Sequence, residues 1–78
     1  MVKNSINPNN LSGTLNLIKK EIEKNFKCKV NASNVELHIC NGYIDYHFEN
    51  DNIRVNYEII TSNGAFFYHQ TEFYYLND

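Results

Sequence analysis

Apolar and polar residues alternate along IRVNYEIIT, residues 53–61 of the chain. Every second residue is apolar, namely Ile53, Val55, Tyr57 and Ile59. A period of two is typical of a half-buried strand. Turn-forming residues bracket the stretch at 49–52 (ENDN) and at 62–64 (SNG). The strand is therefore predicted to pair with a neighbour on each side.

Two more strands are predicted before it, at 35–40 and 43–49, joined by Asn41-Gly42. This dipeptide favours a two-residue hairpin turn because both positions tolerate positive φ. The turn predicts pairs that place all apolar residues on one face. These pairs are Ile39 with Ile44, Leu37 with Tyr46, and Val35 with Phe48. The next turn is predicted to pair Phe48 with Ile53, Tyr46 with Val55, and Ile44 with Tyr57.

The turn into a fourth strand, residues 65–75, allows two registers. A two-residue Asn63-Gly64 turn would place Gln70 and Glu72 on the core face. A three-residue turn that includes Ser62, with a bulge at Gly64, keeps Glu72 outside. Because burying an unpaired carboxylate is costly, the three-residue turn is predicted. Its pairs are Ile59 with Phe67, Val55 with Thr71, Ile53 with Phe73, and Arg54 with Glu72. Phe67, Phe73 and Tyr75 then face the core, and Phe66, Tyr68 and Tyr74 face out.

One amphipathic helix is predicted from Leu11 to Phe26, with Asn10 or Ser12 as its N-cap. Its apolar residues recur at steps of three or four, and they are Leu11, Leu15, Ile18, Ile22 and Phe26. Only the apolar sheet face can cover this stripe. The 78 residues are therefore predicted to form a single small α+β domain, with the helix packed on a four-stranded antiparallel β-meander.

Residues 1–10 are predicted to form an N-terminal arm that is interrupted at Pro8. Val2 and Ile6 would suit a short extra strand. With that strand, the element order resembles the cystatin-like topology. The inhibitory motifs of cystatins, among them a glutamine-valine-x-alanine-glycine hairpin, are absent from this sequence. The resemblance therefore concerns topology and implies no function.

The charges are divided unevenly, although the formal net charge is only −2. Residues 1–33 carry six lysines and two glutamates, whereas residues 34–78 carry one arginine and seven carboxylates. Cys28 and Cys40 show no disulfide or metal-binding spacing. The N-terminus has no apolar signal segment, and no apolar run is long enough to cross a membrane. A cytoplasmic protein with reduced thiols is predicted, and the abundance of residues with A/T-rich codons indicates a low-GC bacterium or its phage.

The outward side of the predicted sheet gathers carboxylates and tyrosines. The residues expected to bind a partner are Glu36, Tyr43, Asp45, Glu49, Glu58, Tyr68 and Tyr74. Tyrosine is favoured at protein interfaces, and apolar residues on both faces of an edge strand call for a cover. The N-terminal arm, a second copy (a homodimer) or a foreign protein would provide one. Nucleic acid is not expected on this side, because phosphates require cations next to the stacking rings.

His38 and His47 share this side with Glu36, Asp45 and Cys40, and all five are residue types that bind zinc. Tight paired ligand spacings are missing, so we predict ordinary cross-strand pairing of His38 with Asp45 and of Glu36 with His47, and no metal or cofactor. An open sheet face offers no pocket that excludes water. Catalysis is therefore not predicted.

Two functional hypotheses follow. The first is a small non-enzymatic protein-binding module, an inhibitor of the anti-CRISPR or anti-restriction type from a phage or mobile element. It would dock the acidic, tyrosine-bearing side of its sheet on a larger, basic protein. The second is a nucleic-acid-binding accessory protein whose helix contacts phosphates through Lys19, Lys20, Lys24 and Lys27.

Overall fold

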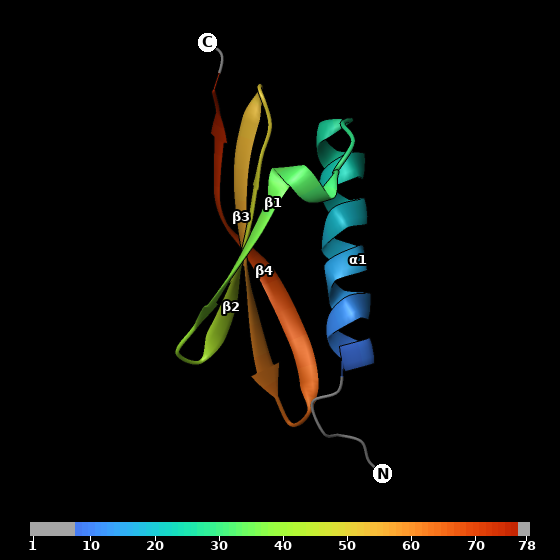
Figure 1. Cartoon of the computed structure of the whole chain (residues 1–78), viewed down its shortest axis with the longest axis vertical. Coiled ribbons are helices and arrows are strands. Elements are labelled where there is room, and N and C mark those ends of the chain that lie inside the picture. The colour runs from blue at the N-terminus through green and yellow to red at the C-terminus, as the bar shows by residue number, and fades with distance from the viewer. Residues whose placement is uncertain (1–7, 77–78) are drawn as a thin grey trace.

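The computed structural model describes residues 8–76, which form one helix beside a four-stranded antiparallel sheet (Figure 1). Each strand pairs with the next one in sequence, so the sheet order is β1-β2-β3-β4. This confirms the predicted α+β fold with a β-meander. The elements are α1 (Pro8–Phe26), a short 3-10 helix η1 (Ala32–Asn34), β1 (Val35–Cys40), β2 (Tyr43–Glu49), β3 (Ile53–Ser62) and β4 (Ala65–Tyr75).

Helix α1 contains the predicted helix from about Leu11 to Phe26, which is thereby confirmed, and it begins one turn earlier, at Pro8. Proline is favoured in the first helical turn because its φ is already helical and its missing N–H would have no intrahelical partner there. Asn10 and Ser12 consequently lie inside the helix, and the prediction that one of them is the N-cap is wrong. Any extra strand within the predicted arm falls in residues 1–7, outside the described part of the chain.

The hairpin between β1 and β2 has the predicted register. Ile39 pairs with Ile44, and Val35 pairs with Phe48. Gly42 in the connecting turn has a φ of 93°, a conformation that glycine adopts without a steric penalty. The Asn41-Gly42 signal thus fixes both the turn and the pairing of the strands on either side of it.

The hairpin between β2 and β3 is shifted by two residues from the predicted register, because Phe48 pairs with Val55 and not with Ile53. The Asn50 N–H donates to the Ile53 carbonyl at 3.0 Å. The Asn50 side-chain oxygen accepts the N–H groups of Asn52 (2.7 Å) and Ile53 (2.8 Å). An asparagine that bonds the backbone ahead of it stabilises a tight turn. Since the shift is even, the apolar residues keep their predicted face.

The hairpin between β3 and β4 has a two-residue turn, so the predicted three-residue turn is wrong. Ser62 pairs with Ala65. Asn63 and Gly64 between them have φ values of 53° and 79°, and two positive values are typical of the tightest hairpin turns. Three aromatic residues therefore lie on the opposite face from the predicted one. They are Phe66 and Tyr68, which pack against the core, and Phe67, which is exposed.

A bulge at Thr71 corrects the register further along β4. The pairing passes from Tyr57–Gln70 to Asn56–Glu72, so Thr71 is an extra residue in β4. Its hydroxyl donates to the Asn56 carbonyl at 3.3 Å. Beyond the bulge, Glu72 points away from α1, as the cost of burying a carboxylate requires. Phe73 then packs against the core, as predicted.

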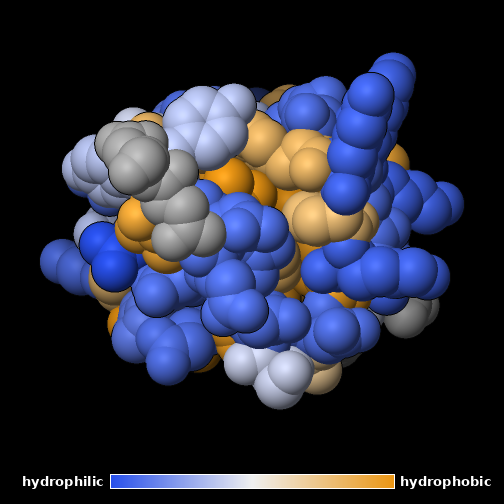
Figure 2. Space-filling model, turned by 90° about the horizontal axis from the view of Figure 1, so that it is seen from above, coloured by the Kyte–Doolittle hydropathy of each residue, from blue (hydrophilic) through white to orange (hydrophobic). Residues whose placement is uncertain are grey.

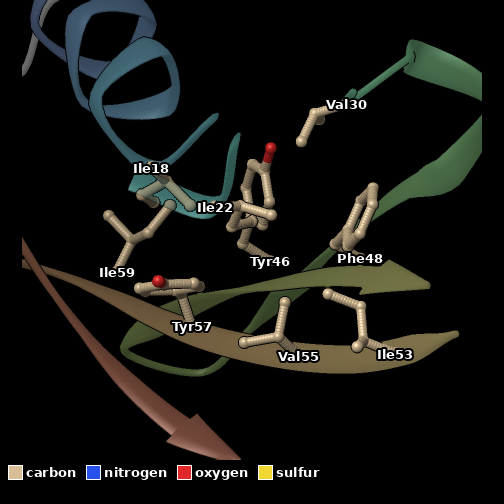
Figure 3. Packing of buried hydrophobic residues seen from close by; sticks show 9 residues of the cluster. All are labelled: Ile18, Ile22, Val30, Tyr46, Phe48, Ile53, Val55, Tyr57 and Ile59. Atoms are coloured by element: carbon tan, nitrogen blue, oxygen red, sulfur yellow. The ribbon is translucent and has the colours of Figure 1, made fainter. Parts of the chain in front are cut away.

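The core lies between α1 and the inner face of the sheet (Figure 3). Ile18 and Ile22 of α1 point toward Tyr57 and Ile59 of β3, and all four are at most 1% exposed. The other buried apolar residues are Val30, Tyr46, Phe48, Ile53 and Val55. Every inward residue of β3 from 53 to 59 is thus buried, as the alternation in this stretch predicts.

Helix α1 covers the sheet unevenly. It lies along β4 (Figure 1), and β1 is at the opposite edge of the sheet. On the inner side of β1, Leu37 is 46% exposed and Ile39 is 87% exposed. These two residues lie on the apolar face as predicted, but they are not buried there. A groove of about 280 Å³ separates α1 from β1 and is lined by residues that include Leu15, Lys19, Val30, Leu37 and Tyr46.

The molecule is elongated, measuring 48 × 23 × 19 Å. The end seen from above in Figure 2 is mostly hydrophilic, with apolar surface visible between polar side chains. None of the helical segments within residues 8–76 combines the length and the apolar character needed to cross a membrane.

Candidate protein-binding face

We define the outer face as the side chains of the sheet that point away from α1. It contains Glu36, His38, Cys40, Tyr43, Asp45, His47, Glu49, Arg54, Asn56, Glu58, Ile60, Phe67, His69, Glu72 and Tyr74. Six of the seven predicted binding residues lie on it, and they are Glu36, Tyr43, Asp45, Glu49, Glu58 and Tyr74. Tyr68 does not. The alternation of the strands is sufficient to find these six, because each lies in a segment whose parity was correctly predicted.

Two acidic residues occupy opposite positions on neighbouring strands at the centre of the outer face. Asp45 of β2 pairs directly with Glu58 of β3. His38 of β1 flanks Asp45, and His69 of β4 flanks Glu58, whose carboxylate is 3.3 Å from the His69 ring nitrogen. Like charges directly opposite each other on neighbouring strands destabilise a sheet. The predicted registers would place Glu58 between Tyr43 and Tyr68, and the observed registers show that this is wrong.

A chain of side-chain contacts runs from Asp45 toward Arg54. Asn56 donates its side-chain N–H to Asp45, and its oxygen contacts His47 Nδ1. His47 Nε2 is 3.4 Å from Glu49 Oε1, which accepts a hydrogen bond from Arg54 Nε at 3.0 Å. The Arg54 hydrogen bond, followed by the contact with His47, lowers the pKa of Glu49 below its ordinary value. This carboxylate therefore stays charged.

Arg54 is the only arginine of the chain, and its charge is directed to Glu49. The predicted pairing of Arg54 with Glu72 is wrong, because Arg54 pairs with Tyr74 on β4. Glu72 is instead paired with Asn56, and it accepts a hydrogen bond from the Tyr74 hydroxyl at 3.4 Å. The carboxylates of Glu58 and Glu72 consequently have no arginine of their own chain in contact within the described residues.

A polar hollow of about 270 Å³ opens at the β1–β2 side of the outer face. It is lined by Ser33, Asn34, Glu36, His47 and Glu49. Asn34 is held there by its side-chain N–H, which donates to the Glu49 carbonyl at 3.1 Å. The sequence predicts Glu36 and Glu49 but misses Ser33 and Asn34, because a connection between elements carries no periodicity that would place it against a sheet face. Two carboxylates around a small polar hollow suit the cationic end of a lysine or arginine.

Tyrosines lie at two places on the outer face. Tyr43 follows the β1–β2 turn, where its hydrogen bond with Cys40, and then the charge of that residue, raise its pKa above the ordinary value. Tyr74 lies near the end of β4, beside Glu72. Phe67 and Ile60 are a cross-strand pair on the same face, and both are exposed. The acidic centre is thus accompanied by accessible aromatic and aliphatic surface.

Tyr68 faces α1, contrary to the prediction that it belongs to the outer face. Its hydroxyl donates to Glu21 Oε1 at 3.3 Å, and the hydroxyl of Tyr57 donates to Oε2 of the same carboxylate at 2.7 Å. Burial and the charge of Glu21 raise the pKa of Tyr68. The two-residue Asn63-Gly64 turn is the sequence signal that places Tyr68 correctly. Tyr68 therefore supports the position of the helix and does not contribute to the outer face.

The group of possible metal ligands around His38 and His47 is a weaker candidate site than the acidic centre. His38 contacts Glu36 (3.4 Å) along its own strand, and the backbone pairs His38–Asp45 and Glu36–His47 are as predicted. Within the part of the chain that the structure describes, no group of three or more His, Cys, Asp or Glu residues is placed to hold a metal ion.

The lysines of the predicted basic surface are all exposed. Lys19, Lys20 and Lys24 project from α1, and Lys27 follows its last residue. Glu23 lies among them in sequence, but its carboxylate accepts the Val30 N–H at 3.0 Å. This surface is therefore a cationic strip, interrupted by one carboxylate that is engaged in closing the loop after the helix.

Family models, curated proteins and solved structures were compared with the chain, and none of them matches it. Its function is therefore inferred from its own residues and their geometry.

Proposed function

We propose that this protein is a non-enzymatic binding module that docks its outer face on a basic surface of a larger protein. The observation that carries the proposal is the Asp45–Glu58 pair at the centre of that face. Two carboxylates opposite each other weaken the isolated sheet. A lysine or arginine from another protein would relieve this repulsion. Binding would therefore stabilise the sheet by supplying the positive charge that is missing between these two carboxylates.

The surroundings of this pair support the same conclusion. Glu36 and Glu49 line the polar hollow on one side, and Glu72 lies on the other side, across Asn56. Arg54 is already engaged by Glu49. Carboxylates spread over one face steer a cationic partner toward it, and this speeds association. Tyr43 and Tyr74 add the aromatic contacts that interfaces favour.

The consequence that we propose for docking is inhibition. A small domain with an acidic face can occupy the basic groove that a nucleic-acid-binding protein uses for phosphates. Small size and residues with A/T-rich codons support an anti-CRISPR or anti-restriction type of inhibitor from a phage or mobile element. The thiols of Cys28 and Cys40, which are free, support a cytoplasmic site of action.

The decisive variant is the double neutral replacement Asp45→Asn with Glu58→Gln. Both new side chains keep an oxygen acceptor for Asn56 and His69, while the repulsion disappears. The variant should be as stable as the wild type or gain up to about 0.5 kcal/mol. The protein that wild-type beads capture from a low-GC bacterial lysate should associate with the purified variant about tenfold more slowly at low salt.

Asp51→Asn removes one charge from the β2–β3 turn, away from the outer face, and is the control for nonspecific charge effects. It should leave the association rate within about twofold of wild type. If the double variant bound the captured protein as fast and as tightly as the wild type, the acidic centre would not be the interface. A loss of binding together with a loss of stability would indicate misfolding, and the stability measurement distinguishes the two cases.

The second candidate function is nucleic-acid binding by the exposed lysines of α1. The observation that favours it is their separation from the outer face, since they lie on the helix and not on the sheet. Contacts of this kind are not sequence-specific and depend strongly on salt. Anisotropy titrations with single- and double-stranded oligonucleotides at low salt test it. Binding that Lys19→Gln with Lys24→Gln abolishes would support the idea, and no binding to any oligonucleotide would end it.

A further inference from the structure

Strand β1 is an open edge of the sheet. It pairs with β2 on one side, and none of the residues from 8 to 76 pairs with its other side. The opposite edge, β4, is interrupted by the Thr71 bulge. Strand β1 pairs without a register shift over residues 35–40, and it contains no proline or lysine. Bulges, prolines and lysines are the usual protection of an edge against pairing, so β1 lacks the protection that β4 has.

We propose that β1 pairs antiparallel with β1 of a second copy of the chain, with the two-fold axis at Leu37. The backbone supplies the first argument. Cys40 and Tyr43 flank a two-residue turn and therefore exchange hydrogen bonds. In an antiparallel ladder the direction of these groups alternates. The N–H and C=O groups of Leu37 and Ile39 consequently point to the open edge.

The proposed register matches these groups. The Leu37 N–H of each copy donates to the Leu37 carbonyl of the other. The Ile39 N–H of each copy donates to the Val35 carbonyl of the other. The Val35 N–H is not needed, since it already donates to the Ala32 carbonyl within its own chain. The pairing thus extends the meander into a continuous sheet without breaking a backbone hydrogen bond of the monomer.

The second argument is the complementarity of Glu36 and His38, which distinguishes this register from those shifted by two residues. With the axis at Leu37, Glu36 of each copy lies opposite His38 of the second copy. A shift by two residues in one direction would set Glu36 against Glu36, and a shift in the other direction would set His38 against His38. Both side chains are exposed, at 71% and 58%, and are therefore accessible to another chain. Only the central register pairs a carboxylate with an imidazole, which can donate a hydrogen bond to it.

The apolar side chains supply the third argument. On the inner side, Leu37 of one copy lies beside Leu37 of the other, and Ile39 lies beside Val35. Ile39 is 87% exposed in the single chain, and it lies beyond the part of the sheet that α1 covers. Pairing would give it apolar neighbours. The outer face remains open in this dimer, so the inference does not depend on the proposed function.

Sedimentation equilibrium of the full chain over a range of concentrations tests the inference. A monomer–dimer equilibrium is expected. Leu37→Lys should raise the dimer dissociation constant at least about tenfold, because it places two ammonium groups side by side at the axis. Leu17→Lys is the matched control, since Leu17 is also exposed (55%) but lies on α1, and it should leave the constant within about twofold. Far-UV circular dichroism verifies that both variants fold.

The register has its own test. Glu36→Lys and His38→Glu should each weaken the dimer about tenfold, because the first removes both carboxylate–imidazole pairs and the second replaces them with pairs of carboxylates. The double variant sets a lysine opposite a glutamate and should restore the wild-type constant to within about threefold. Amide hydrogen exchange at Leu37 and Ile39 should slow as the protein concentration rises. A monomer at every concentration would overturn the inference, as would a dimer that Leu37→Lys leaves intact or that the charge exchange fails to restore. Protection of these amides in a chain that sediments as a monomer would likewise overturn it.

Discussion

Removing one hydroxyl from the core tests how the helix is held on the sheet. Tyr57 is completely buried, and its hydroxyl donates to Glu21 of α1 at 2.7 Å. Tyr57→Phe deletes this hydrogen bond and leaves the ring in place, so no cavity is created. The variant therefore isolates the hydrogen bond between the Tyr57 hydroxyl of β3 and Glu21 of the helix.

The expected loss follows from the geometry. A hydrogen bond to a charged group contributes about 1.5–3 kcal/mol to stability. Glu21 is only partly buried, and it keeps the longer hydrogen bond from Tyr68 at 3.3 Å. Water and Tyr68 therefore replace part of what is lost. We expect Tyr57→Phe to lower the free energy of unfolding by about 1–2 kcal/mol at neutral pH.

The same contact predicts a dependence on alkaline pH. Burial, and then the hydrogen bond to Glu21, raise the pKa of Tyr57 above its ordinary value of 10.0. The stabilisation is thus fully present below about pH 10 and is lost at higher pH, since only the unfolded chain then releases the proton. The loss is about 1.4 kcal/mol per pH unit. The difference in unfolding free energy between wild type and variant should therefore vanish at about pH 11.

Urea unfolding followed by far-UV circular dichroism at neutral pH and near pH 11 measures both effects. Tyr75→Phe is the control, because Tyr75 is 67% exposed and its replacement should change stability little at either pH. Equal stability of Tyr57→Phe and wild type at neutral pH would refute the role of the Glu21 contact. A difference that persists unchanged at pH 11 would refute the alkaline shift of Tyr57.

The other predictions concern packing, turns and the bulge, and the same urea titrations measure them. Phe48→Ala empties a fully buried site and should cost about 3–5 kcal/mol; a smaller loss would mean that the core collapses around it. Gly42→Ala should cost about 1 kcal/mol or more, because Gly42 has a φ of +93° although nothing lies near its Cβ position. Gly13→Ala is its counterpart in the exposed face of α1 and should gain about 1 kcal/mol; the same sign for both would contradict the backbone argument. Deletion of Thr71 keeps the Asn56–Glu72 pair and should change stability by less than about 1 kcal/mol, but gel filtration should show new self-association through an unprotected β4 edge.

The parts of the fold that follow from the sequence are those determined by periodicity. Alternation places the inward residues of β3 without any knowledge of their partners, and Asn41-Gly42 fixes the register of β1 on β2. The register of β2 on β3 does not follow from periodicity. It depends on the Asn50 side chain, which closes a tight turn. The predicted turn, with four residues between Phe48 and Ile53, is longer than the observed one. Nothing in the pattern of apolar residues distinguishes registers that differ by two.

The bulge in β4 has the predicted physical cause but lies at a different position from the predicted one. The cost of burying Glu72 requires one extra residue somewhere between the turn and position 72. The sequence-based prediction places that residue in the turn, whereas the structure has it at Thr71. Both solutions leave Glu72 outside, but only the observed one turns Phe66 and Tyr68 toward α1. The position of a bulge is determined by what packs on both sides of it, which for β4 includes Glu21 of the helix.

The sequence reveals which residues lie on the outer face, but it does not reveal which of them are neighbours. The set of residues on a face depends only on parity, so Glu36, Asp45 and Glu58 can be assigned to it even when a register is wrong by two. Which of them are neighbours depends on the register itself. The pairing of Asp45 with Glu58, on which the proposed function depends, becomes visible only when the Asn50 turn is known. A total count of carboxylates predicts attraction to basic proteins in general, whereas a like-charged pair locates the position at which a cation of the other protein should bind.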